Sequence, residues 1–325
     1  LMGSPFRGEG FTCELDSSTP LFIPNKQVKE LRQKLVKELT DLRIKNGADA
    51  EVTPQEQVLN WIDANKVAAK AKPGLKLNLL LRDKDQVEDV AKAIATGEIE
   101  TSGINLVILD FEFGLDFEPS LKVLRDQGMK VAIATTRILK PNEHRNVKHL
   151  LNLNPDAILA RNLGAVQYLQ ANAYTGQILG DFSLNVTNHL TAQYLLQKGL
   201  SSVCLGYDLN HVQVEELIQA GQAERFEVTA YQYMPSFHME HCVFAAFLSK
   251  GTSFKDCGKP CEKHQVKLKD QFGNWHQIKP DQECRNTMYN GTSQSAARYI
   301  KDWESHGLGY VRYEALKERG AELIS

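Results

Sequence analysis

Three short apolar segments decide the fold of this chain: Leu106-Val-Ile-Leu-Asp110, Val131-Ala-Ile-Ala-Thr135 and Ala157-Ile-Leu-Ala-Arg161. Each segment is apolar along almost its whole length and ends at a polar residue. Such continuous apolar runs are typical of parallel strands that are buried on both faces. The residues between the runs have helical periodicity, so strands and helices are expected to alternate.

The alternation extends in both directions along the chain. The further expected strands are Leu77–Leu81, Gln177–Gly180, Val203–Leu205, Phe226–Ala230 and Tyr310–Tyr313. Eight strands with intervening helices predict an α/β fold of the (β/α)8, TIM-barrel-like kind. A doubly wound open sheet is the alternative. No Gly-x-Gly-x-x-Gly motif follows any strand, which disfavours the dinucleotide-binding form of such a sheet.

The segment between the seventh and eighth strands breaks the alternation. Residues 266–279 are typical of a small hairpin around Gly273-Asn274. We therefore expect a barrel domain over residues 73–325, with a cysteine-bearing, metal-binding insertion over about 242–292. Residues 1–72 are expected to form a separate N-terminal segment with helices that begin at Asn25 and after Thr53-Pro54. This segment is interpreted as the end of an upstream region of a longer chain.

Four of the six cysteines lie in this insertion: Cys242, Cys257, Cys261 and Cys284. Four thiolates are the usual ligand set of zinc or of an iron–sulfur cluster. Their spacing matches neither a zinc finger nor a ferredoxin, so two disulfides or four unrelated buried thiols are alternatives. No signal peptide or membrane-spanning apolar run is present, so we expect a cytoplasmic, reducing compartment and no membrane partner, which favours metal over disulfides.

Polar residues follow the expected strands, at the barrel end where active sites of this fold lie. We expect a pocket for a polar, anionic ligand there, with catalytic roles for three of these residues and cofactor binding by two: Arg161, Asp181 and Asn185, then Asn162 and Arg312. His238 and Glu240 precede Cys242 and are further catalytic candidates, with Glu240 as a general base beside a metal-bound water. The net charge of −2 does not indicate a general polyanion-binding protein.

The chain resembles the collagenase-like peptidase family U32. The resemblance covers residues 75 to 316 and is carried by five segments: Met234-Pro-Ser-Phe-His-Met-Glu-His-Cys-Val-Phe-Ala-Ala-Phe247, Cys257-Gly-Lys-Pro-Cys-Glu262, Cys284-Arg-Asn-Thr287, Ala160-Arg-Asn-Leu-Gly164 and Gly180-Asp-Phe-Ser-Leu-Asn185. It implies a TIM-barrel-like fold, similar to the C-terminal barrel of the long members, with four cysteines around a metal centre. In short members a second cysteine follows the first by about two helical turns. Ser249 occupies that position here, so Cys261 would supply the fourth thiolate, and the cofactor is a 4Fe–4S cluster or zinc.

Three classes of function are open, two of them implied by the resemblance. Some members look like oxygen-independent hydroxylation factors for RNA or ubiquinone, so an enzyme or assembly component of the hydroxylation type is favoured, with an RNA or small-molecule substrate. The family name comes from proteolysis, which implies a metal-dependent peptidase that uses His238, Glu240 and His241. The third class is a non-catalytic, zinc-stapled domain that binds a protein partner. The sequence lacks a Gly-x-Ser-x-Gly motif, which disfavours ordinary serine-dependent hydrolysis.

Overall fold

The computed structural model describes residues 6, 10, 22–47, 53–67, 74–251 and 255–324. The chain divides into two compact units, Leu1–Ala64 and Asn65–Ser325. The first unit contains helices α1 (Asn25–Gly47) and α2 (Gln55–Ala64), where the sequence predicts helices. None of the described helices has the length and apolar character needed to cross a membrane.

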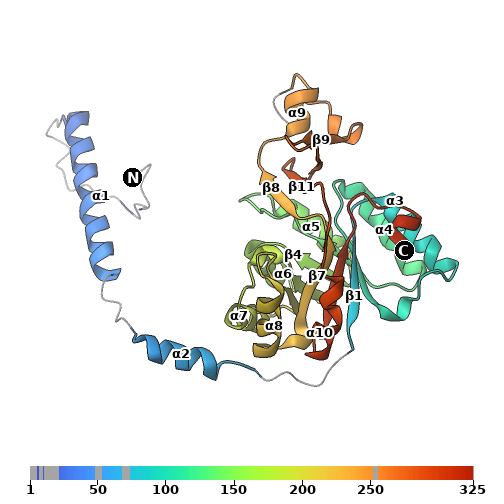
Figure 1. The fold of residues 1–325 in the computed structure, drawn as a ribbon. Helices are drawn as coiled ribbons and strands as arrows, with labels where there is room; N and C mark the ends of the chain where they lie inside the picture. The colour runs from blue at the N-terminus through green and yellow to red at the C-terminus, as the bar shows by residue number, and fades with distance from the viewer. Residues whose placement is uncertain are drawn as a thin grey trace. The chain divides into compact units, whose positions relative to one another are not determined.

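In the described part of the second unit, eight parallel strands form a closed barrel (Figure 1). The strands are β1 (Lys76–Leu81), β2 (Ile104–Leu109), β3 (Val131–Ala134), β4 (Ala157–Ala160), β5 (Gln177–Gly180), β6 (Ser202–Cys204), β7 (Phe226–Gln232) and β13 (Tyr310–Glu314). Strands β1 to β7 pair in chain order, and β13 closes the barrel between β7 and β1. The TIM-barrel-like prediction is therefore confirmed, and the open sheet is excluded.

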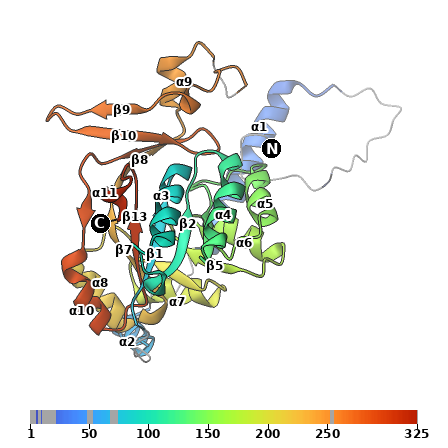
Figure 2. The same ribbon diagram turned by 90° about the vertical axis from the view of Figure 1, so that its right-hand side faces the viewer.

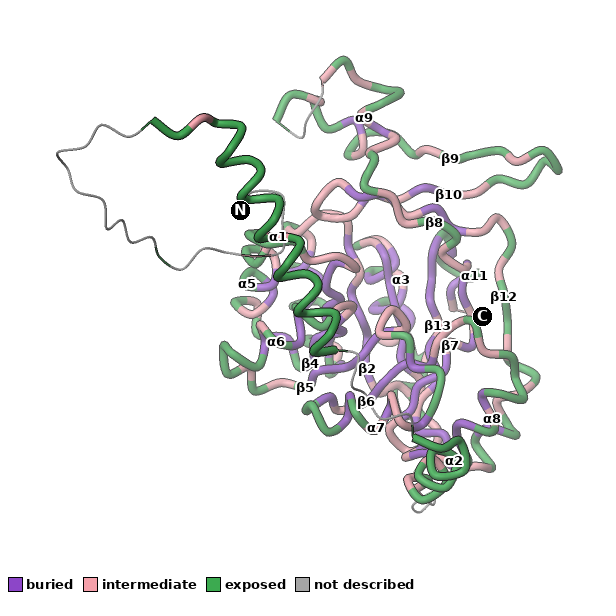
Figure 3. Tube along the Cα trace, turned by 90° about the vertical axis from the view of Figure 1, so that its left-hand side faces the viewer, coloured by how far each residue is buried: buried purple, intermediate pink, exposed green. Residues whose placement is uncertain are grey.

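Helices cover the outside of the barrel, and their outer faces are exposed while the strands are buried (Figure 3). These helices are α3 (Lys84–Ala95), α4 (Phe117–Asp126), α5 (His144–Asn152), α6 (Leu163–Ala171), α7 (His189–Gln197), α8 (His211–Ala220), α10 (Ile300–Ser305) and α11 (Ala321–Ile324). Asn188 and Asn210 begin α7 and α8, because their side chains accept hydrogen bonds from the free N–H groups of the first turn.

The interior of the barrel has an apolar part and a charged part. Alternate residues of the strands point inward, and eight of them form an apolar cluster inside the barrel: Leu80, Leu106, Ile108, Ala132, Ala134, Ala157, Leu159 and Leu179. The inward positions of β13 and the start of β7 instead carry Arg312, Glu314 and Glu227, all buried. The apolar layers that usually fill such a barrel are thus replaced on one side by charges.

The predicted insertion after the seventh strand is present as a four-stranded antiparallel sheet with the order β8-β11-β10-β9. Its strands are β8 (Pro235–Met239), β9 (Val266–Lys269), β10 (Trp275–Pro280) and β11 (Asn286–Tyr289). Strands β9 and β10 form the expected hairpin. The sheet lies across one end of the barrel (Figure 2). The insertion begins earlier than expected, because β8 precedes the first of its cysteines.

Candidate active site and thiol cluster

A pocket lies between the barrel and the inserted sheet. Its barrel side is formed by the carboxyl ends of the strands, including Asp110, Thr135 and Arg161, and its other side by His238, Lys279 and Thr287 of the sheet. The pocket encloses about 60 Å³, enough for several water molecules or a small polar group. The position agrees with the general location of active sites in this fold.

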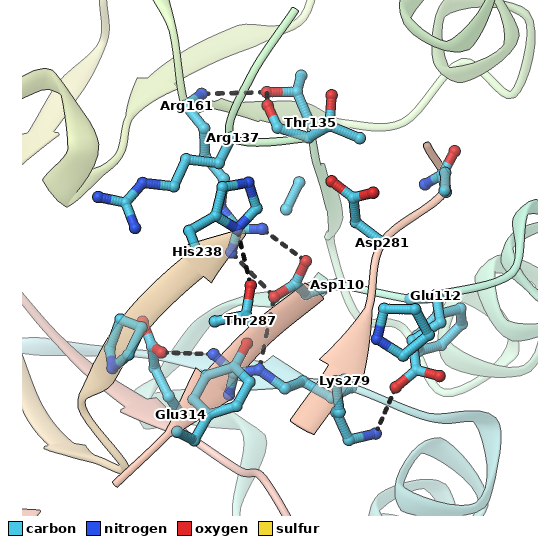
Figure 4. A pocket seen from close by; sticks show the side chains of 18 of the residues that line it. Asp110, Glu112, Thr135, Arg137, Arg161, His238, Lys279, Asp281, Thr287 and Glu314 are labelled. Carbon is cyan, nitrogen blue, oxygen red and sulfur yellow. Dashed lines mark hydrogen bonds and ion pairs between the residues drawn. The ribbon is translucent and has the colours of Figure 1, made fainter. Parts of the chain in front are cut away.

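Arg161 forms part of the floor of the pocket (Figure 4). Its Nη1 and Nη2 donate to the two carboxylate oxygens of Asp110 at 2.7 and 2.9 Å, and its Nε donates to Asp181 Oδ2 at 2.8 Å. The bidentate geometry fixes the plane of the guanidinium group. Arg161 is therefore paired with two carboxylates, and three of its five N–H donors are used.

Arg312 continues this chain of charges below the pocket. Its Nη1 donates to Asp181 Oδ1 at 2.7 Å and to Glu314 Oε1 at 3.1 Å, and its Nη2 donates to Glu227. Both Arg312 and Asp181 are 0% exposed. Burial alone would raise the pKa of Asp181, but the charges of Arg312 and Arg161 outweigh it and hold the pKa at about 2.

The expected pocket residues are therefore only partly at the pocket. Arg161 lines it, whereas Asp181 and Arg312 lie beneath it. Asn162 begins α6: its Oδ1 accepts from the Ala165 N–H at 2.7 Å. Asn185 is exposed and adopts a left-handed conformation with φ of 56° at the end of a short 3₁₀ turn. These contacts position the barrel loops, and the catalytic and cofactor roles of the residues stay predictions.

His238 lies in strand β8 rather than in a helix, and its side chain points into the pocket (Figure 4). Its Nδ1 is 2.9 Å from Thr287 Oγ1, whereas its buried Nε2 has no hydrogen-bond partner among the described residues. Burial and the charges of Arg137 and Arg161 lower the pKa of His238 to about 4. The imidazole is therefore neutral near pH 7, where it can donate or accept one further hydrogen bond.

Glu240 lies away from the pocket lining, and its side chain is held by two cations. Its Oε1 accepts from Arg285 Nε at 2.8 Å, and its Oε2 accepts from Lys140. Hydrogen bonds from Lys140 and Arg285 lower the pKa of this carboxyl group. A carboxylate held in this way is a weak base, so the geometry does not favour the general-base hypothesis for Glu240.

Two side chains outside the predicted site are better placed in the pocket. Arg137 lines it, stacks over the Phe182 ring with its guanidinium carbon 5.3 Å from the centroid, and forms no ion pair with any described carboxylate. Asp281 also lines the pocket, its Oδ2 is buried without a partner among the described residues, and burial raises its pKa to about 6. Arg137 could have been found from the sequence, because it follows a predicted strand of the barrel. No sequence pattern places Asp281 in the pocket, because its position depends on the fold of the inserted sheet.

The four cysteines of the insertion, here called the thiol cluster, lie near the inserted sheet, and electrostatic interactions connect Cys284 with the other three. Cys242 begins helix α9 (Val243–Leu248), and Cys261 lies in the 3₁₀ turn η5 (Pro260–Glu262); both pack against the Phe244, Ile278 and Met288 side chains. Burial and the charges of Cys242, Cys261 and Cys257 raise the pKa of Cys284 to about 11. The thiols therefore lie within electrostatic range of one another, and all four are free.

The donor set fits the chemistry of a four-thiolate metal centre, because the four cysteines of the insertion are all free and half-buried. As they are placed, no group of three or more His, Cys, Asp or Glu side chains in the described residues is arranged to hold a metal ion. Metal binding by Cys242, Cys257, Cys261 and Cys284 thus stays a prediction that their proximity supports.

Comparison with known proteins gives one family. A model of peptidase family U32 matches residues 110–318. Among solved structures, the U32 peptidase Mk0906 is 14% identical, with a TM-score of 0.43, over 79% of this chain and 98% of that chain. A glycerol uptake operon antiterminator-related protein from Thermotoga maritima is 11% identical, with a TM-score of 0.31, over 48% of this chain and 94% of that chain. The search of curated proteins found no match.

Replacing Arg312 with methionine should lower the free energy of unfolding by about 3–5 kcal/mol, because it leaves buried carboxylates without their cation. Arg319→Met is the matched control. Arg319 pairs with Asp85 and Asp89 at the surface, where the loss should be below about 1 kcal/mol. Urea denaturation of both variants measures the difference, and equal losses would contradict the structural role of Arg312.

The contribution of Asp181 to stability should depend on pH. Its pKa is about 2 in the folded chain and about 3.9 in an unfolded chain. The stabilisation is therefore fully present above about pH 4 and is lost as the pH falls toward 2. The stability gap between the wild type and Asp181→Asn, measured by urea denaturation, should shrink across this window. A gap that does not change with pH would show that Asp181 is not charged in the folded protein.

Proposed function

The chain belongs to peptidase family U32, and we propose that it is a metal- or iron–sulfur-dependent enzyme, or assembly component, of the hydroxylation type. The observation that carries this proposal is the joining of the thiol cluster and the pocket by one small sheet. His238 in the pocket lies four residues before Cys242. Asp281 and Thr287, also in the pocket, flank Cys284 at three residues on either side.

The four thiols favour a metal or iron–sulfur centre that takes part in the chemistry of the pocket. A 4Fe–4S cluster would supply electron transfer when bound, whereas zinc would supply a Lewis acid or a structural staple. Cys242 and Cys261 pack on the side of the sheet that holds Ile278 and Met288, and the pocket lies on the side that holds Lys279 and Thr287. Only the backbone of the inserted sheet therefore lies between these thiols and the pocket.

The protein groups in the pocket suit a polar, anionic substrate such as RNA or a small acid. Arg137 offers a half-buried guanidinium group without an ion-pair partner among the described residues. His238 offers a neutral ring nitrogen for orientation. Asp281, with a pKa of about 6, is the carboxyl group best suited to hold or release a proton near neutral pH.

The same geometry does not favour ordinary proteolysis. Among the described residues that line the pocket, none is a serine or a cysteine. Glu240, the predicted base of a metal-dependent peptidase, is bound by Arg285 and Lys140 outside that lining. Peptidase activity is thus the weaker of the two enzymatic hypotheses.

Protein purified without oxygen should contain zinc, or iron with acid-labile sulfide, and Cys284→Ser should lose most of it because one of four thiolates is removed. Cys204→Ser is the matched control, since Cys204 is a free cysteine buried in strand β6 of the barrel and should leave the metal content unchanged. Elemental analysis and visible absorption measure the outcome. A metal-free wild type, or equal metal in both variants, would refute the proposal.

A further inference from the structure

A second cavity lies between the strands of the barrel and the helices that cover them. It is bounded by β6, β7, the start of α8, the 3₁₀ turn η6 (Ala297–Tyr299) and α10, and the exposed strand β12 (Gln294–Ser295) lies at its edge. Figures 1 and 2 show α8 and α10 side by side at this place. The cavity encloses about 260 Å³. Its floor consists of side chains from the apolar cluster that joins strands and helices: Leu205, Val214, Val228, Ala230 and Trp303.

The lining of this cavity differs in charge from that of the candidate active site. Among the described residues that line it, none is an aspartate, glutamate, lysine or arginine, and His211 is exposed at the rim. The candidate active site is lined by residues of all four kinds. A charged ligand would lose its hydration in the second cavity without gaining a counter-charge, which is costly. The lining therefore favours an uncharged occupant and disfavours a phosphate or a carboxylate.

Aromatic rings form one wall of the cavity. The His211 and Tyr299 rings are stacked with centroids 4.5 Å apart, and the Trp303 ring lies 5.8 Å from that of Tyr299. Such rings offer faces and edges to a further planar group. An apolar cavity of about 150 Å³ is large enough to hold benzene. A cavity of about 260 Å³ therefore suits a planar compound of two fused rings.

One buried amide in the lining has an unused acceptor. Gln232, at the end of β7, is 6% exposed and lines the cavity. Its Oε1 is buried and has no hydrogen-bond partner among the described residues. Buried polar atoms are nearly always hydrogen-bonded, and an unsatisfied one lowers stability. An N–H or O–H group of a bound molecule would satisfy this acceptor.

We propose that this cavity is a second small-molecule site, which binds an uncharged bicyclic aromatic compound with one N–H or O–H group, of the indole kind. The rings of the ligand pack against Trp303 and Tyr299, and its N–H donates to Gln232 Oε1. The proposal goes beyond the proposed function, because the two cavities share no lining residue and no cysteine of the insertion lines the second one.

Calorimetric titration of the full chain with indole and with benzofuran tests the role of the amide. Benzofuran has the size of indole but carries an oxygen in place of the N–H group. Wild-type protein should bind indole about fivefold more tightly, as one hydrogen bond allows. Gln232→Leu should remove this preference and leave benzofuran binding unchanged. Gln219→Leu is the matched control, because Gln219 is exposed on α8 outside the cavity, and it should keep the preference.

Val214→Phe tests the cavity itself. The added ring should occupy the space, so indole binding should be lost while the melting temperature stays the same or rises. Val166→Phe is the matched control. Val166 is buried on α6 in the same apolar cluster and lines neither cavity, so its variant should melt at a lower temperature because its surroundings are already packed.

Four results would overturn the proposal. The first is wild-type protein that does not bind indole, and the second is indole binding that Val214→Phe leaves intact. The third is a melting temperature that falls as far in Val214→Phe as in Val166→Phe, which would show that the space is not there. The fourth is indole-3-carboxylate that binds as tightly as indole, because the lining offers no cation for its charge. None of these measurements depends on the metal content, so they leave the proposed function to its own test.

Discussion

A continuous chain of buried ion pairs, Arg312–Asp181–Arg161–Asp110, crosses the interior of the barrel, and the site above it depends on this chain. It joins β13 to the ends of β5, β4 and β2. Each desolvated charge is tolerable only because its partners satisfy it, so the four side chains hold one another in a single arrangement. The floor of the pocket is therefore held in one arrangement, and the three hydrogen bonds to Asp110 and Asp181 leave two of the five N–H donors of Arg161 for a further partner.

The inserted sheet adds a second constraint, because its two faces contact different parts of the molecule. One face packs Ile278 and Met288 against Phe244 next to the thiols, while the other turns His238 and Thr287 toward the barrel. Anything that orders the thiol cluster also orders the roof of the pocket. In this arrangement the barrel supplies one side of the pocket, the sheet supplies the other, and Arg137 and Asp281 are available for a ligand.

The sequence predicts the barrel well because its strands are buried on both faces, and short apolar runs such as Val131–Ala134 that alternate with amphipathic helical segments are typical of such strands. It predicts the individual roles of polar residues poorly. Arg312 lies within β13, and its partner Asp181 is 131 residues away in sequence, so neither local pattern nor spacing shows that the two are paired and buried. His238 is in a strand because β11, with Thr287 49 residues further on, pairs with it. Asp281 likewise lies in the pocket only because the strands of the inserted sheet pair over long distances in sequence.

The central claim is that the four cysteines of the insertion form one metal centre beside the pocket. X-ray absorption at the metal edge, on protein purified without oxygen, tests it most directly. The account predicts four sulfur neighbours at about 2.3 Å, supplied by Cys242, Cys257, Cys261 and Cys284 or by these together with inorganic sulfide. A first shell made of nitrogen and oxygen neighbours would contradict it, because the thiol cluster would then not be where the metal binds.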